Sequence, residues 1–240
     1  LFGRRPQVFR NTELIYNDDI GKRISSLGFR GIITDGVQKI VGNSYSINQL
    51  YHHPEESSMR ILLRNSTLSD DIAFRFSGPL KADTYLSWLH DVPTFERVVT
   101  VAMDYETFGE HHRKETGIFA FLKTVVTLIG KSTHFKMLTP SEAIDSIAPL
   151  KALPVSNWVS WADRERDLSA WLGNDMQKDA FASLVKLEKA VKSLGNPEVL
   201  KRWRVLQTSD HFYYMATKKG MDGTIHNYFS PFPSPYEAFI

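Results

Sequence analysis

The sequence predicts an α/β fold followed by a helical region, and three observations support this. Short apolar runs alternate with helix-period segments over roughly the first 150 residues, an order typical of consecutive βαβ units. Beyond Pro154 the strand pattern ends and two long helical stretches follow. The chain has 240 residues and is 42% hydrophobic. It is therefore large enough for one barrel-type domain or two smaller domains with cores of their own.

The first βαβ unit is predicted close to the start of the chain. Residues 8–10 read as a buried strand, and Asn17 with the two following aspartates is a typical cap for a helix. Gly28 is expected to end this helix, because glycine tolerates the left-handed conformation found after helix C-termini. Residues 31–34 then form the next predicted strand.

The next unit repeats this order. We expect a strand at residues 61–63, a helix capped at 69–71 that continues through Phe76, and a second helix over 82–89. Residues 98–103 are the following predicted strand. The pattern favours strands that run in parallel, because helices separate them.

The last predicted part of the α/β region contains two helices and one strand. Apolar residues recur at helical spacing from Ile118 to Leu128, and residues 135–138 read as a short strand. Thr139 and Glu142 then form a capping box, with proline at the first helical position.

The C-terminal third is predicted to be helical. Residues 175–194 and 198–215 are two helical stretches joined by a Gly-Asn-Pro turn. Residues 219–240 are rich in proline, serine and aromatics, and we expect an extended segment there. An apolar stripe in the first stretch is expected to face a core; it consists of Phe181, Leu184, Leu187, Val191 and Leu194.

Composition excludes several classes of partner. The net charge is +2, which gives no bulk attraction to nucleic acid or to an anionic membrane. No apolar run approaches the roughly 18 residues of a membrane span, and the absence of cysteine suits a reducing compartment, so we expect a cytoplasmic protein. The chain begins without methionine and almost directly in a strand, which we interpret as a fragment that lacks its beginning. The sequence gives no indication of oligomeric state.

Carboxylates follow two of the predicted strands. Asp104, Glu106 and Glu110 come directly after residues 98–103, together with two histidines, and Glu13 follows residues 8–10. Side chains at the C-terminal ends of parallel strands point into the crevice where α/β proteins hold ligands. Three interpretations are open: a glycosidase pair, a metal site, or structural ion pairs and caps.

The metal interpretation would use this cluster together with His52 and His53, since imidazole and carboxylate suit zinc. However, His111 and His112 are adjacent and point in different directions, and no spacing places two histidines on one helical face. His52 and His53 are instead expected in a polar loop.

The glycosidase interpretation rests on chemistry. Cleavage of a glycosidic bond needs one carboxyl group to protonate the leaving oxygen and a second to attack or stabilise the anomeric carbon. Polar and aromatic side chains that suit sugars surround the two candidate carboxylates, namely Arg10, Asn11, Tyr16, Tyr105 and His111.

Five ordered blocks also carry a family resemblance. They read FRNTELIYND, LSDDIAFRF, MDYETFGEH, LSAWLGN and TSDHFYY, at residues 9–18, 68–76, 103–111, 168–174 and 208–214. Together they resemble glycoside hydrolase family 57, in its α-amylase-like branch, through nearly the whole chain.

The resemblance implies a retaining enzyme on α-1,4-glucans or maltooligosaccharides, with no cofactor and no obligatory metal. Glu13 matches the family's nucleophile and Asp104 its general acid/base. It also implies an incomplete seven-stranded (β/α) barrel carrying the catalytic carboxylates over residues 1–150, of which this chain has the C-terminal part, then a helical subdomain over 151–218 and the extended tail over 219–240.

Further residues in or near these blocks are expected to bind substrate: Arg10, Tyr16, Glu106, His111, Trp171, Asp175, Asp210 and His211. Other interpretations stay open. Trp171 can be a core tryptophan, Asp210 and His211 can form a buried hydrogen-bonded pair, and Glu106 or His111 can pair with an arginine or cap a turn. Two family blocks that precede this region are absent, and about five strands are predicted against the seven implied. A 4-α-glucanotransferase and a non-catalytic glucan-binding protein therefore remain alternatives.

Overall fold

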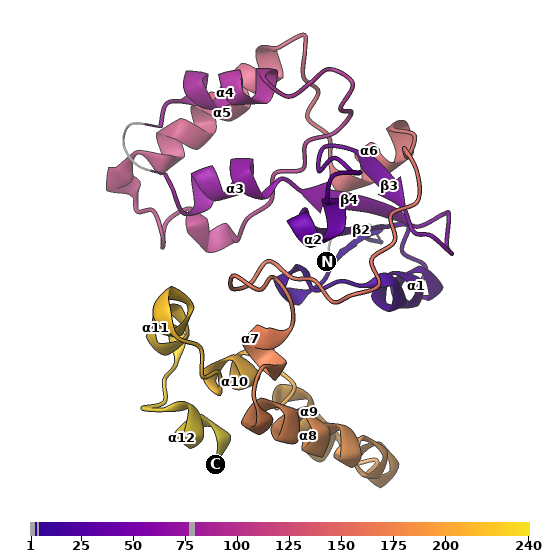
Figure 1. Ribbon diagram of the computed structural model, residues 1–240, viewed down its shortest axis with the longest axis vertical. Coiled ribbons are helices and arrows are strands. Elements are labelled where there is room, and N and C mark those ends of the chain that lie inside the picture. The colour runs from indigo at the N-terminus through magenta and orange to yellow at the C-terminus, as the bar shows by residue number, and fades with distance from the viewer. Residues whose placement is uncertain (1–2, 4, 77–79) are drawn as a thin grey trace. The chain divides into compact units, whose positions relative to one another are not determined.

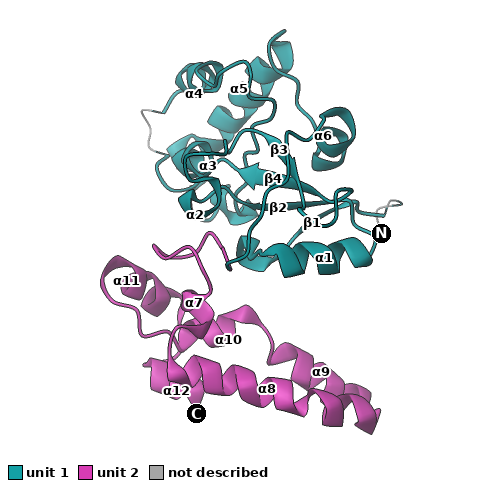
Figure 2. Cartoon of the chain, turned by 45° about the vertical axis from the view of Figure 1, so that its right-hand side comes forward, with its two compact units in different colours: residues 1–157 teal, residues 158–240 magenta. Residues whose placement is uncertain are grey.

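A computed structural model describes residues 3, 5–76 and 80–240. The chain divides into two compact units, residues 1–157 and 158–240, which Figure 2 colours separately. Each unit is described by itself.

A small mixed sheet organises the first unit. Within the described residues it has four strands in the order β1-β2-β4-β3. β1 (Val8–Arg10), β2 (Gly31–Asp35) and β4 (Arg60–Arg64) are parallel, while β3 (Leu50–His52) pairs antiparallel with β4. The parallel strands bring their C-terminal ends to the same edge of the sheet.

Helices cover both faces of this sheet. α1 (Asp18–Ser26) and α6 (Pro140–Ser146) lie on opposite sides of it (Figures 1 and 2). Asn17 caps α1, and the capping box of Thr139 and Glu142 opens α6, both as predicted. α6 packs its buried Ile144 in a cluster with Leu50 and Leu62 of the sheet. The α/β class is thereby confirmed.

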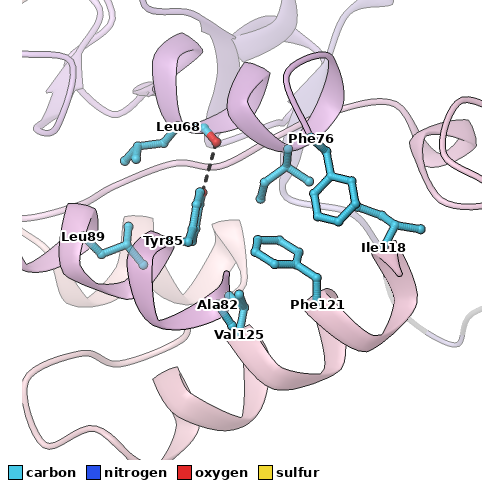
Figure 3. Close-up of a cluster of buried hydrophobic side chains, with 9 residues drawn as sticks. Leu68, Phe76, Ala82, Tyr85, Leu89, Ile118, Phe121 and Val125 are labelled. Carbon is cyan, nitrogen blue, oxygen red and sulfur yellow. Dashed lines mark hydrogen bonds between the residues drawn. The ribbon is translucent and has the colours of Figure 1, made fainter. Parts of the chain in front are cut away.

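A second core lies among three helices of the same unit. α3 (Ser66–Ala73), α4 (Ala82–His90) and α5 (Ile118–Lys131) enclose the apolar cluster drawn in Figure 3, with α4 and α5 side by side. The Tyr85 hydroxyl donates to the Leu68 carbonyl at 3.1 Å, so its polar end is satisfied inside this core. The remaining short elements of the unit are α2 (Gln38–Val41) and the 3₁₀ turns η1 (Thr12–Leu14), η2 (Tyr105–Thr107) and η3 (Lys114–Thr116).

Two predicted strands are wrong. Residues 98–103 form no strand, and in the described structure they contribute only an isolated parallel bridge between Thr100 and Arg64. Residues 135–138 are not a strand either, because Phe135 packs on the three-helix core while Leu138 packs on the sheet cluster. Their apolar side chains connect two cores, and an apolar run alone does not distinguish this from a strand.

Two further predictions in this unit are corrected. α3 begins at Ser66 and ends at Ala73, because Asn65 caps the Leu68 amide and Ser69 lies inside the helix. β3 was missed, and the loop predicted at His52 and His53 is partly strand. The sequence signal for a three-residue strand is too short to detect.

The second unit is helical throughout its regular structure. It contains α7 (Ser169–Leu172), α8 (Asp175–Leu194), α9 (Pro197–Val205), α10 (Ser209–Tyr214), α11 (Gly220–Phe229) and α12 (Pro235–Phe239). Fully buried Gln177 joins three of these helices, since its Nε2 donates to the carbonyls of Ala170 and Phe212, each at 2.8 Å.

Three predictions for this unit are wrong. The stretch 198–215 is broken at 206–208, where the Thr208 hydroxyl donates to the Val205 carbonyl and closes α9. The stripe on α8 is largely exposed, with Phe181 at 46% and Leu194 at 64%, since a 20-residue helix of about 30 Å is too long for so small a unit to cover. Residues 219–240 form α11 and α12, because Pro235 starts a helix that Ser234 caps.

The seven-stranded barrel implied by the resemblance stays a prediction.

In the described part of the chain, no helix is long and apolar enough to cross a membrane.

Candidate active site

Glu13 stands on a strained turn after β1. Asn11 holds the turn, because its side chain accepts from the Thr12 amide and donates to the Ile15 carbonyl at 3.0 Å. Glu13 and Leu14 have φ of 52° and 51°, the left-handed region that residues with a Cβ seldom adopt. Such a conformation costs about 1–3 kcal/mol and is typical of positions under functional constraint. Thr34 at the end of β2 supports the turn by donating to the Leu14 carbonyl at 3.1 Å.

Asp104 follows the segment 98–103 and begins a tight loop. Gly109 has φ of 120°, and its amide donates to the His112 carbonyl at 3.0 Å, which closes the loop. His112 anchors it, because its ring contacts Phe76 and its Nε2 lies 2.9 Å from the Ala73 carbonyl. Glu106 and His111 remain exposed at the surface of this loop.

The two predicted segments meet through an ion pair. Arg10 Nη2 lies 3.3 Å from Asp104 Oδ1, with 45% and 41% of the two side chains exposed. β1 and the segment before Asp104 both run parallel to their neighbours, β2 and β4, so both residues stand at the same edge of the sheet. The structure thereby brings Arg10 and Asp104 together from positions 94 residues apart.

The environment of Asp104 favours its protonated form. Partial burial raises the pKa of this carboxyl group and the neighbouring Glu106 raises it further, while the charges of Arg10, His111 and Arg64 partly offset that rise. The net direction is upward. A carboxyl group in such surroundings holds a proton to higher pH than an ordinary aspartate, as a general acid must.

Sequence reasoning missed a buried polar cluster near Asp104, formed by Arg64, Asp35 and Asp70. Arg64 ends β4, is 2% exposed, and pairs with Asp35 and Asp70. It also donates from Nε to the Ala102 carbonyl at 2.7 Å. An arginine directly after the apolar run of a predicted strand was the available signal, because a charge at that place needs partners.

Tyr16 is not at the site surface. It is 0% exposed. Its hydroxyl group packs against Gly21 of α1, and the His53 ring packs against the same glycine. This contradicts the prediction that Tyr16 contacts substrate. Burial also raises the pKa of the Tyr16 hydroxyl, since a phenolate would lose its hydration.

The other four predicted contacts belong to the second unit. Trp171 is 6% exposed and packs near Tyr213, with ring centroids 6.4 Å apart, which agrees with a core tryptophan. Asp175 and Asp210 are exposed in the first turns of α8 and α10, and His211 is half-buried.

His53 is a structural histidine. It is fully buried, and its Nδ1 accepts from the Glu55 and Glu56 amides. Its Nε2 therefore carries the proton and donates to the Asp18 carbonyl at 2.8 Å. Both ring nitrogens are used. His53 lies in the loop after β3, as predicted, but its side chain is buried and not in contact with solvent. Among the residues that the structure describes, no three or more His, Asp or Glu side chains gather as metal ligands.

Comparison with known proteins identifies the family. Residues 1–156 match the model of glycosyl hydrolase family 57. The chain belongs to glycosyl hydrolase family 57. It is 46% identical over 255 residues to a protein of Methanocaldococcus jannaschii described as "Putative alpha-amylase", and the match covers 100% of this chain and 54% of that protein. The chain thus spans about half the length of this relative.

Solved structures share the fold at low identity. A branching enzyme of Pyrococcus horikoshii is 15% identical with a TM-score of 0.68, over 95% of this chain and 55% of the other. A 4-alpha-glucanotransferase of Thermococcus litoralis is 16% identical with a TM-score of 0.56, over 89% and 34%. These structures support the fold alone.

The family 57 match covers only part of the resemblance. Three of the five blocks, including those with Glu13 and Asp104, lie inside residues 1–156. The blocks at 168–174 and 208–214 lie beyond it. The family assignment therefore rests on the unit that carries both candidate carboxylates.

Proposed function

We propose that this family 57 chain is a retaining glycosidase on α-1,4-glucans, with Glu13 as nucleophile and Asp104 as general acid/base. The observation that carries the proposal is the raised pKa of Asp104, together with its place in a loop at the carboxyl end of the parallel strands. The strained turn at Glu13 supports it, because the sequence keeps a glutamate where the backbone disfavours one.

Each carboxyl group has one task in the first step. The Glu13 carboxylate attacks the anomeric carbon, and the bond from that carbon to the glycosidic oxygen breaks with its electron pair passing to the oxygen. Asp104 gives its proton to this oxygen, so the leaving sugar departs as a neutral alcohol. The product of the step is a glycosyl ester on Glu13.

In the second step Asp104 acts as a base. Its carboxylate takes a proton from a water molecule, and the water oxygen attacks the anomeric carbon from the side that the leaving sugar occupied. The ester bond breaks and Glu13 returns to its ionised form. Two inversions at one carbon retain its configuration.

Contacts to the sugar are proposed for the side chains at the loop surface. Arg10, Glu106 and His111 are polar and near Asp104 in the chain or in space, so each can bond a hydroxyl group. Asp175, Asp210 and His211 of the second unit stay proposed contacts on the basis of the family resemblance.

A 4-α-glucanotransferase is the second candidate. In that reaction an acceptor sugar replaces water in the second step, with Asp104 taking the proton of its hydroxyl group. Tyr105 favours this alternative, since it directly follows Asp104 and is 90% exposed, and an exposed ring offers a flat face to a sugar. Product analysis separates the two, because transfer gives longer oligosaccharides without a net gain of reducing ends.

The experiment is digestion of soluble starch and maltoheptaose by this chain and by two variants, Glu13→Gln and Glu115→Gln. Glu115 is an exposed glutamate of the same unit and serves as the matched control. We expect Glu13→Gln to lower turnover by about three or more orders of magnitude while glucan binding persists, and Glu115→Gln to act like the unmodified chain. Binding without turnover in the unmodified chain would instead indicate a glucan-binding protein.

A further inference from the structure

Shortly before Asp104, side chains of two other elements hold the backbone of Ala102. Ser69 Oγ accepts from the Ala102 amide at 3.1 Å, and Arg64 Nε donates to the Ala102 carbonyl at 2.7 Å. Both backbone polar groups of Ala102 are thus fixed, two residues before Asp104. Ser69 is fully buried and Arg64 almost so, which protects these bonds from competition with water.

The Arg64 guanidinium is itself immobilised by two other elements. Its Nη1 lies 3.1 Å from Asp35 at the end of β2, and its Nη2 binds Asp70 on α3. Asp35 is fully buried. Three donors of one planar group therefore reach three acceptors on separate elements, a geometry that an ammonium group cannot reproduce.

We propose that Arg64 is a positioning residue for Asp104, locking the segment before it onto the carboxyl end of β2 and the side of α3. This inference rests on the proposed function, in which Asp104 is the general acid/base. The reason is geometric: proton transfer needs the carboxyl group within hydrogen-bond reach of the glycosidic oxygen. A misplacement of about 1 Å can cost on the order of 100-fold in rate.

The charge of Arg64 also affects the pKa of Asp104. Together with Arg10 and His111 it lowers the pKa of Asp104, against the rise from burial and from Glu106. Arg64 therefore acts mainly on where the carboxyl group sits, and its charge is the smallest of these contributions to the pKa of Asp104.

The first test replaces the planar guanidinium group of Arg64 with an ammonium group of the same charge. In Arg64→Lys the ammonium can pair with Asp35 or Asp70 but no longer also holds the Ala102 carbonyl. We expect kcat on maltoheptaose to fall by about 10- to 100-fold with KM changed by less than about 3-fold, because only the transition state needs the aligned acid. An unchanged kcat in a folded Arg64→Lys variant would overturn the inference.

Arg75→Lys is the matched control for this test. Arg75 also pairs through its Nε with an aspartate, Asp71 at 2.6 Å, but it follows the end of α3 and has 54% of its side chain exposed. We expect its kcat and KM to equal those of the unmodified chain. A loss of kcat equal to that of Arg64→Lys would assign the effect to α3 stability and contradict the positioning role.

The second test needs no variant of Arg64 and no turnover. In ¹⁵N NMR spectra of the unmodified chain, the Arg64 Nε–H should exchange with water far more slowly than that of Arg75. Its chemical shift should follow the titration of Asp104, and Asp104→Asn should remove that inflection. An Arg64 Nε–H that exchanges as fast as that of Arg75 would overturn the inference. Absence of turnover in the unmodified chain would instead contradict the proposed function, and this NMR comparison would still decide the role of Arg64.

Discussion

At the residue scale, the proposed chemistry depends on how Asp104 keeps its proton. Burial and Glu106 raise its pKa, whereas the guanidinium of Arg10 at 3.3 Å lowers it. The two side chains are 45% and 41% exposed, so solvent screens the pair and limits its strength to about 0.2–1 kcal/mol. Arg10 therefore lowers the pKa of Asp104 but does not alone determine its protonation state.

Replacing Arg10 should move the pH dependence in a known direction. Arg10→Gln removes a charge that stabilises the Asp104 carboxylate, so the pKa of Asp104 rises further. The basic limb of kcat/KM reports loss of the protonated acid and should move to higher pH by about 0.2–0.7 units. The measurement is the pH profile of maltoheptaose cleavage.

The control for this profile is Arg30→Gln. It removes another half-exposed arginine of the same unit, one that pairs with Asp145, and we expect no shift of the basic limb. A limb that stays in place, or moves to lower pH, in Arg10→Gln would show that the ion pair does not act on the catalytic acid.

Sequence reasoning singled out the carboxylates that follow residues 8–10 and 98–103 but not the residues that support them. Glu13, Asp104 and Arg10 could be predicted, because polar residues directly after apolar runs are visible in the sequence. The role of Arg64 could not, because its partners Asp35, Asp70 and Ala102 come from three distant positions. The burial of Tyr16 was missed because its position relative to α1 depends on the turn at Glu13.

At the element scale, Asn65 joins α3 to the segment before Asp104. Its Oδ1 accepts from the Leu68 amide, its Nδ2 donates to Asn48, and its backbone amide donates to the Thr100 carbonyl at 2.8 Å. It is 5% exposed. The buried Asn65 side chain thus caps α3 and binds Asn48, while its backbone amide binds the segment before Asp104.

Asn65→Ala should therefore destabilise the first unit more than loss of a cap alone. We expect about 2–4 kcal/mol, since a helix cap is worth about 1 kcal/mol and the unpaired buried side-chain oxygen left at Asn48 adds about 1–3. Asn17→Ala, which removes the cap of α1, should cost about 1 kcal/mol. Amide hydrogen exchange in β2 and β4 would measure both, and equal losses would contradict the double role of Asn65.

Element prediction succeeded where local signals agree with packing. β1, β2 and β4 are short apolar runs flanked by turn residues, and α6 has a complete capping box. Residues 98–103 have the same apolar pattern, but apart from an isolated bridge to the end of β4 they bond to Asn48, Asn65, Ser69 and the Arg64 side chain. These partners come from distant positions that the tertiary fold brings together, so the sequence pattern alone could not predict the bonds.

At the scale of the whole molecule, each unit has its own interior, and that of the second unit contains charges. Asp163 has 5% of its side chain exposed and lies 3.0 Å from His226 Nε2 and 3.5 Å from Lys218 Nζ. Burial acts to raise the pKa of Asp163, but the hydrogen bond and charge of His226 and the charge of Lys218 outweigh it, so this pKa is lowered.

The ion pairs of Asp163 predict that the stability of residues 158–240 falls at acidic pH. Because the pKa of Asp163 is lower in the folded state, its stabilisation is present above the unfolded value of about 3.9 and is lost as pH falls through the folded value. Asp163→Asn should cost about 3–5 kcal/mol at pH 7, and the difference should shrink below about pH 4. Tryptophan fluorescence during urea unfolding reports this unit, since it holds four of the five tryptophans, at 158, 161, 171 and 203.

Glu165→Gln is the control in the same cluster. Glu165 also binds Lys218, at 2.8 Å, but has 47% of its side chain exposed, so we expect a loss below about 1 kcal/mol. A pH-independent difference between Asp163→Asn and the unmodified chain would contradict an ionised Asp163 in the folded state.

The central claim is that Glu13 forms a covalent bond to the sugar, and trapping tests it most directly. A 5-fluoro-α-maltosyl fluoride forms the glycosyl ester quickly and releases it slowly, so the ester accumulates on a retaining enzyme. We predict that the tryptic peptide of residues 11–22, in which Glu13 is the single glutamate, gains the mass of the fluorinated glycosyl group, with fragment ions placing it on Glu13. Glu13→Gln should not be labelled. A chain that cleaves starch but carries no label, or carries it on another residue, would contradict the account.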